Sequence, residues 1–281
     1  MTSASESAVP VTVIRPSKGW SWDDLVELWR YRELLFFLIW RDVKVRYKQT
    51  LLGAAWAILK PFFTMVVFTI IFGRLAEIPT DSAPAPIFYF AGLLPWILFQ
   101  DGISKASTSL VANRNLVTKV YFPRIAIPMA TVVSGVIDFA LAFVVLLGMM
   151  VFYRFTPAAT IWLLPLFLLV ALVTALGAGL WLAALNVAYR DIGYVTPFIV
   201  QAWLYASPVA YSASLIPKGW GQLAYGLNPM AGVVQGFRWV VLGVGQPEPA
   251  MLAISLVVSL LLLISGVFYF RRMERTFADV V

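Results

Sequence analysis

The chain alternates long apolar runs with short polar stretches, and this pattern predicts a bundle of membrane-spanning helices. The hydrocarbon core of a bilayer is about 30 Å thick, so a helix that crosses it needs roughly 20 mostly apolar residues. The stretches that meet or approach this length are 51–72, 86–112, 125–153, 161–188, 194–210 and 250–270, and the fifth is the shortest. We therefore expect an all-α integral membrane protein whose residues 51–281 form one six-helix transmembrane domain.

Residues 20–50 precede the first predicted span and form a different kind of segment. Trp22, Leu25 and Trp29 recur at helical spacing among charges, and Arg30 and Arg32 follow them. This pattern favours an amphipathic helix lying in the membrane interface, followed by a basic segment. A soluble amphipathic helix packed on a partner is the alternative.

Two further stretches lie outside the predicted spans. Residues 1–19 lack the basic start and apolar core of a signal peptide, so we expect an uncleaved, disordered cytoplasmic tail. Residues 211–245 contain two short apolar pieces separated by Asn228 and Pro229, and neither piece is long enough to span. We expect short re-entrant helices on the periplasmic side, with a single kinked seventh span as the alternative.

The composition supports a membrane protein and excludes several kinds of site. The chain is 61% hydrophobic and 12% charged, which is more apolar side chain than a soluble chain of 281 residues can bury. It contains no Cys and no His, so disulfides, Cys- or His-ligated metals and Ser-His catalysis are excluded. No glycine-rich loop ends in Gly-Lys-Ser or Gly-Lys-Thr. We expect no catalytic residue, metal site or cofactor in this chain.

The distribution of the 21 Lys and Arg residues predicts the orientation. Short cytoplasmic loops are enriched in these residues. If the amino terminus is cytoplasmic, the basic residues that fall outside are only Arg74, Arg154, Lys218 and Arg238, while Lys60 and Lys105 lie within spans. Both termini are then cytoplasmic, and the net charge of +7 reflects membrane orientation and not a nucleic-acid partner.

Charged residues inside the predicted spans are candidates for a functional path, because a charge at mid-membrane is costly unless it meets water or a partner. Asp101 and Lys105 are four residues apart, so they share a helix face and are expected to pair. Asp138 lies near the middle of the third predicted span, and Lys60 lies in the first. A polar path and a structural ion pair with a buried carboxylate are both consistent with this pattern. Two acids without a His make a poor proton relay.

Aromatic residues near the span ends are further candidates. Trp96, Trp203 and Tyr205 would line a conduit in which rings stack on sugar faces, but membrane-interface belts contain the same residue types. Composition does not separate these two roles.

The predicted inner loops have the features of docking elements. The loop after the second span combines basic, apolar and aromatic residues and suits a short amphipathic helix seated on a cytoplasmic partner. Its candidate contacts are Arg114, Asn115, Lys119, Tyr121, Phe122 and Arg124, and the next inner loop adds Tyr189, Arg190 and Asp191. A positive-inside anchor and a tight helix hairpin are the alternatives.

Several segments carry a family resemblance. They are RDVKVRYKQTLLGAAWAILKPF, FAGLLPWILFQDGISKASTSLVANRNLVTKVYFPR, ALNVAYRDIGYVTPFIVQAWLYASPVAYS and LNPMAGVVQGFRW, with RTFADVV at the end of the chain. Together, and in this order, they resemble the membrane subunit of type-2 ABC transporters that export lipid-linked O-antigen, capsule or teichoic acid polymers from bacteria. The match covers roughly residues 40 to 240. Lys60 departs from the family, which often carries an uncharged residue there.

The resemblance implies a homodimer in the bacterial inner membrane that encloses a channel for an undecaprenyl-linked polysaccharide, and we expect O-antigen as the cargo. ATP and Mg²⁺ would bind two copies of a separate ATPase subunit. The loop at Arg114–Arg124 would be the coupling helix, and the short outer helices would form a periplasmic gate. Lys60 would either meet the carrier's pyrophosphate or extend to the interface. Export of another cargo, such as a lipid or drug, and an unrelated ion-coupled carrier or membrane enzyme are the remaining alternatives.

Overall fold

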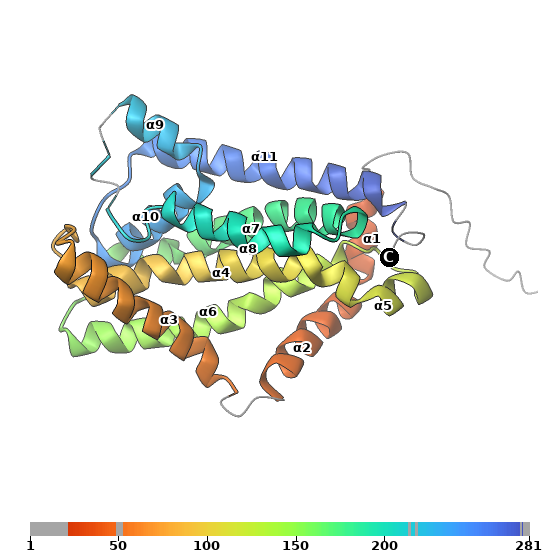
Figure 1. The fold of residues 1–281 in the computed structure, drawn as a ribbon, viewed down its shortest axis with the longest axis horizontal. Coiled ribbons are helices and arrows are strands. Elements are labelled where there is room, and N and C mark those ends of the chain that lie inside the picture. Colours follow the sequence, from red (N-terminus) through yellow and green to blue (C-terminus); the bar gives the residue numbers. More distant parts are fainter. Residues whose placement is uncertain (1–21, 49–52, 213–214, 217–218, 276, 278–281) are drawn as a thin grey trace, which may run out of the picture.

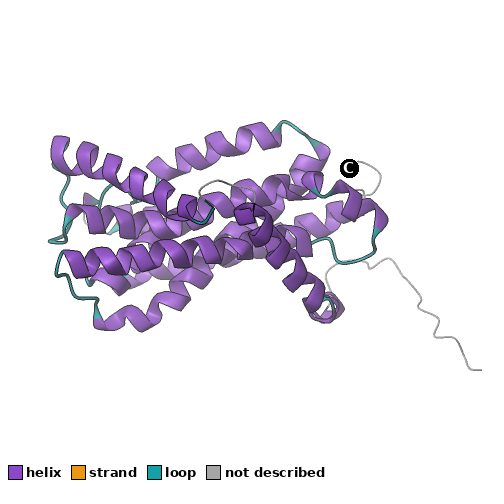
Figure 2. Ribbon diagram, turned by 90° about the horizontal axis from the view of Figure 1, so that it is seen from below, coloured by secondary structure: helices purple, strands orange, loops and turns teal. Residues whose placement is uncertain are grey.

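A computed structural model describes residues 22–48, 53–212, 215–216, 219–275 and 277. Within these ranges every regular element is a helix, so the predicted all-α class is confirmed for the described part of the chain (Figure 2). The predicted tail, 1–19, and the side chains of Trp22 and Leu25 lie outside the described residues.

The core of the bundle is α4 (Ala85–Ala112), the most extensively buried of the long helices. It packs against α6 (Ala126–Phe152), α7 (Leu164–Ala188) and α10 (Pro229–Leu242), and Figure 1 shows it running through the middle of the molecule. The side chains of Phe90, Phe99 and other apolar residues of α4 are fully buried. A helix that is apolar around most of its circumference needs neighbours on several sides, which explains its central place.

The last helix, α11 (Pro249–Glu274), lies against α7 at a close backbone contact. A Cβ atom added to Gly177 of α7 would lie 2.6 Å from the backbone nitrogen of Leu263. A Cβ atom added to Gly266 of α11 would lie 2.5 Å from the carbonyl oxygen of Gly177. Only glycine allows the two backbones to approach this closely, as is common between helices in membranes.

The amino-terminal helices and the short helices complete the fold. They are α1 (Trp22–Arg30), α2 (Arg32–Lys48), α3 (Ala55–Phe68), the π-helix η1 (Thr69–Leu75) that continues α3, α5 (Arg114–Lys119), the 3₁₀ helix η2 (Ala159–Leu163), α8 (Ile192–Tyr205) and α9 (Trp220–Gly226). The short α9 and α10 occupy the region 211–245, where short helices were expected.

The described residues contain five helices that are long and apolar enough to span a membrane. These are Ala55–Leu75, Ala85–Ala112, Ala126–Phe152, Ala159–Ala188 and Pro249–Glu274. The predicted segment 194–210 differs, because its helix α8 has 14 residues and is about 21 Å long at 1.5 Å per residue. The helix ends at Tyr205, and the chain that follows runs through Pro208 without regular helix.

Arg238 anchors α10 to the rest of the bundle. Its side chain is 3% exposed, and its guanidinium carbon lies 3.7 Å from the centre of the Phe88 ring. The guanidinium donates hydrogen bonds to four backbone carbonyl oxygens, those of Phe88, Pro208, Val209 and Tyr211. These bonds tie the irregular segment after α8 to both α4 and α10. A Cβ atom at Gly92 would lie 2.3 Å from the same guanidinium, so α4 needs a glycine there.

The two ends of the bundle differ in character (Figure 1). One end, here called the basic end, carries α1, α5, the turn between α7 and α8, and the carboxyl-terminal part of α11. The opposite end carries η1, the last turn of α6, α9 and α10.

Candidate functional site

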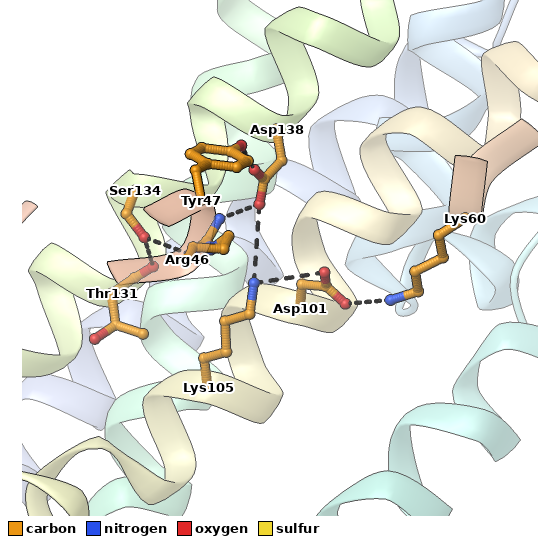
Figure 3. Close-up of polar contacts among 8 residues, drawn as sticks. All are labelled: Arg46, Tyr47, Lys60, Asp101, Lys105, Thr131, Ser134 and Asp138. Carbon is orange, nitrogen blue, oxygen red and sulfur yellow. Dashed lines mark hydrogen bonds and ion pairs between the residues drawn. The ribbon is translucent and has the colours of Figure 1, made fainter. Parts of the chain in front are cut away.

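Four helices bring charged side chains together inside the bundle (Figure 3). Helix α2 contributes Arg46, α3 contributes Lys60, α4 contributes Asp101 and Lys105, and α6 contributes Asp138. These five residues are called the charged cluster below. They line one cavity of about 220 Å³, together with apolar residues such as Trp56 and Leu98.

The carboxylates of Asp101 and Asp138 are each shared between several donors. Lys60 Nζ lies 2.8 Å from Asp101 Oδ1, and Lys105 Nζ lies 3.6 Å from Asp101 Oδ2. The predicted pairing of Asp101 with Lys105 is therefore confirmed. Lys105 Nζ also lies 3.9 Å from Asp138 Oδ2, so it stands between the two carboxylates. Arg46 forms an ion pair with Asp138.

The charged cluster is only partly screened from its surroundings. The exposed fraction of its side chains runs from 20% at Asp138 to 49% at Lys60. Three cations face two carboxylates, which leaves one positive charge in excess along the cavity. Such a chain of shared ion pairs can exchange partners when helices move, because each carboxylate already has a second cation within reach.

Tyr47 supports the cluster from α2. Its phenol donates a hydrogen bond to Asp138, and Arg46 Nη2 donates another to Ser134 Oγ at 3.0 Å. Partial burial, assisted by the hydrogen bond to Asp138, raises the pKa of the Tyr47 phenol to about 12. The phenol therefore remains protonated and able to donate at neutral pH.

Sequence reasoning did not select Arg46, Tyr47 or Ser134 for this site. Arg46 and Asp138 are 92 positions apart, and no spacing rule joins them. The only signal was that Arg46 and Tyr47 end a basic segment just before the first span, a position that a topology marker also explains.

The aromatic channel candidates occupy different environments. Trp96 is 1% exposed and donates from Nε1 to Gln100 Oε1 at 2.9 Å, so it lies inside the core of the single chain. Trp203 is half-buried, and its Nε1 donates to Asn228 Oδ1 at 2.9 Å. Tyr205 is 64% exposed at the end of α8. Of the three, Tyr205 is the one with a largely free ring.

The predicted docking residues lie at the basic end, and all but two of them are exposed. The exposed members are Arg114, Asn115, Lys119, Tyr121, Tyr189, Arg190 and Asp191. Phe122 is 5% exposed and packs into the core beside Phe270 and Phe277. Arg124 is half-buried, and its backbone N–H donates to Glu274 Oε1 at 3.0 Å. Of these two adjacent residues, Tyr121 therefore lies on the surface and Phe122 lies in the core.

The interface-helix candidates lie near the same end. Trp29, which is 72% exposed, and Arg30 lie on α1, and Arg32 begins α2. The Arg32 guanidinium carbon lies 5.8 Å from the centre of the Trp29 ring. An exposed Trp beside arginines is typical of a surface that meets lipid headgroups.

Comparison with known proteins relates most of the chain, including the charged cluster, to one family. Residues 33–242 match the ABC-2 type transporter family. The chain is 32% identical over 252 residues to the O-antigen export system permease protein RfbA of Myxococcus xanthus, covering 88% of this chain and 96% of that protein.

More distant relatives follow the same pattern. The chain is 24% identical over 250 residues to an O-antigen export system permease protein RfbA of Klebsiella pneumoniae, covering 89% of this chain and 95% of that protein. It is 24% identical over 211 residues to the polysialic acid transport protein KpsM of Escherichia coli, covering 73% and 80% of the two chains. The family match covers most of the chain, including the charged cluster, so the protein belongs to the ABC-2 type transporter family.

Proposed function

We propose that this chain is the channel-forming permease of an exporter that moves a lipid-linked polysaccharide, of the O-antigen class, across the bacterial inner membrane. The observation that carries the proposal is the 32% identity with an O-antigen export permease over nearly the full length of both chains. The similarity to a protein named for polysialic acid transport supports export of a sugar polymer over export of a small cargo.

In this proposal the energy comes from a separate ATPase subunit that binds ATP and Mg²⁺. The family association of such permeases with an ATPase supports this division of labour. Two permease chains and two ATPase chains would form the exporter, with both termini of the permease in the cytoplasm. The basic end of the bundle would then face the ATPase, in keeping with the enrichment of basic residues on the cytoplasmic side.

The charged cluster has a role in this proposal as a rearrangeable link between α2, α3, α4 and α6. Movement of the basic end would change which cation each carboxylate binds, so that helix motion is accommodated without leaving a charge unpaired. Lys60, the most exposed member, is our candidate for contact with the pyrophosphate of an undecaprenyl carrier.

The proposal is tested by reconstituting the full chain in vesicles with a partner ATPase subunit from the same organism. ATP hydrolysis should rise with lipid-linked O-polysaccharide and remain at its basal level with the lipid carrier alone or with a phospholipid. Stimulation by a drug or a simple lipid, without stimulation by the polymer, would exclude polysaccharide as the cargo.

The docking assignment is tested with two adjacent residues. Tyr121→Glu changes an exposed ring and should abolish export while the protein still inserts and keeps its thermal stability. Phe122→Leu changes a buried ring and should lower stability with little direct effect on ATPase binding. Normal export by the Tyr121 variant would remove this loop from the coupling interface.

A further inference from the structure

An apolar groove, separate from the charged cluster, lies between α3–η1 and α6. It has a volume of about 640 Å³, within the range of roughly 300–1,000 Å³ typical of ligand pockets. Its lining is mainly apolar and includes Phe62, Met65, Val145 and Gly148, and the polar residues in it are Thr69, Arg74 and Tyr153. This groove is called the α3–α6 groove below.

The groove follows the axis of α3 and η1, and its length is comparable to the depth of one bilayer leaflet. Its lining runs along α3 and η1 from Phe62 to Arg74, which is at most about 18 Å at the α-helical rise of 1.5 Å per residue. That distance is a little more than half of the roughly 30 Å hydrocarbon core. Arg74 lies one residue before the end of η1, and Tyr153 follows the last residue of α6. The charged side chain of Arg74 and the phenol of Tyr153 thus lie at one mouth of a mainly apolar slot.

Arg74 is exposed and, within the part of the chain that the structure describes, takes part in no hydrogen bond or ion pair. It lies on the π-helix η1, which also supplies Thr69 and Ile70 to the groove. π-helical turns are rare in proteins, and those that occur are often found at functional sites. A cation at one end of an apolar slot about one leaflet long is complementary to a phosphate with an attached acyl chain.

We propose that the α3–α6 groove binds an anionic phospholipid of the surrounding bilayer, with one acyl chain between α3 and α6 and the headgroup phosphate on Arg74. The site lies toward the end of the bundle opposite the basic end. This goes beyond the export function, because the ligand is a constituent of the membrane and not the cargo. A bound lipid would fill the space beside α3 and steady that helix against α6.

The chain offers a direct way to fill the groove. A Cβ atom added to Gly148 would meet nothing within 4 Å, so Gly148→Leu projects a side chain into free space without a backbone clash. Ala140→Leu is the matched control, because Ala140 is also exposed on α6 but does not line the groove. Arg74→Gln removes the charge at the mouth, and Arg74→Lys retains it.

The experiment uses the full chain in vesicles that contain a trace of phosphatidylglycerol with a photoreactive acyl chain, and a parallel set with photoreactive phosphatidylcholine. Labelling of the α6 peptide that contains Val145 is measured by mass spectrometry. We expect more labelling by phosphatidylglycerol than by phosphatidylcholine in the unaltered chain. Arg74→Gln should lower labelling by phosphatidylglycerol about five-fold, the effect of about one basic residue at an anionic surface. Arg74→Lys should restore most of it.

The groove variants complete the test. Gly148→Leu should abolish labelling by both lipids, while Ala140→Leu should leave it unchanged. Equal labelling by the two lipids, or unchanged labelling in Gly148→Leu, would overturn the proposal. Displacement of the probe by an undecaprenyl diphosphate would also overturn it, since the site would then belong to the carrier. The chain has no cysteine, so a Val145→Cys variant that cross-links to a second copy would show that protein, and not lipid, covers the groove.

Discussion

The charged cluster and the Arg238 site hold cations inside the bundle by opposite means. Arg238 is 3% exposed and donates to four backbone carbonyl oxygens, and no carboxylate of the described residues accepts a hydrogen bond from it. Lys60 and Lys105 are 49% and 37% exposed at the side chain and pair with the carboxylate of Asp101. One cation is fixed by backbone, and the others are held by side chains that can change partners.

This difference shows how one helical bundle can contain a fixed cation site and a second site whose ion pairs can exchange. Backbone carbonyls cannot leave Arg238 unless the segment 206–212 moves with them, so the contact holds α4, α10 and that segment as a unit. A carboxylate shared between two cations loses little when one of them moves away, because the second remains. The Arg238 site is therefore expected to be the more costly of the two to disrupt.

The largest effect is expected from Arg238→Met. The change leaves up to four buried carbonyls without their donor, and it should destabilise the protein by on the order of 3–5 kcal/mol. Thermal unfolding of the purified chain in detergent measures this loss. Arg238→Lys, which keeps the charge but not the planar fork of donors, should recover only part of it. Unchanged stability in Arg238→Met would show that the guanidinium is not what holds the segment.

A smaller effect is expected from Asp138→Asn. The change removes the carboxylate shared by Arg46, Tyr47 and Lys105. It should lower the free energy of unfolding by about 1–3 kcal/mol. The loss is limited because these donors remain partly open to the cavity and because Lys105 still pairs with Asp101. Asp191→Asn, at an exposed turn, is the matched control and should have little effect. A cost as large as that of Arg238→Met would contradict the adaptable character of the cluster.

Neutralising Asp101 and Lys105 together should be milder than the sum of the two single changes. Asp101→Asn alone leaves Lys60 and Lys105 without this carboxylate, whereas the double variant with Lys105→Met leaves only Lys60, which is 49% exposed. A coupling energy of about 0.5–1.5 kcal/mol in a double-mutant cycle of thermal stability is expected. Additive costs would mean that the pair at 3.6 Å contributes no interaction of its own.

The smallest effect concerns pH and Tyr47. Its pKa is raised to about 12 in the folded protein, above the ordinary value of 10.0, so the folded state favours the protonated phenol. The resulting stabilisation is fully present below pH 10 and is lost as the pH rises toward 12. The difference between tyrosinate absorbance titrations of the native chain and of Tyr47→Phe isolates this phenol, which should ionise well above pH 10.0. A difference spectrum that appears near pH 10 would contradict the hydrogen bond to Asp138.

Some contacts of the charged cluster can be predicted from the sequence and others cannot, depending on whether the two residues lie on the same helix. Asp101 and Lys105 lie four residues apart on one helix, and the helical period alone brings them together. Lys60 and Asp101 are 41 residues apart, and Arg46 and Asp138 are 92 apart, so only the packing of α2 and α3 on α4 and α6 decides these contacts. Phe122 shows the same limit, because its neighbour Tyr121 has a similar ring but faces outward.

The sequence by itself determined that this is a helical membrane protein, where the long apolar helices run, and to which family of transporters the chain is related. These properties depend on the composition, length and order of local segments, because an apolar segment of about 20 residues is long enough to cross the bilayer as a helix. The tertiary structure alone decided that α8 has only 14 residues, that Arg238 is bound by carbonyls, and that five charges from four helices share one cavity. Such contacts depend on how each helix is rotated and shifted along its axis relative to its neighbours. Side-chain packing across the bundle sets these positions, and no periodicity in the sequence predicts them.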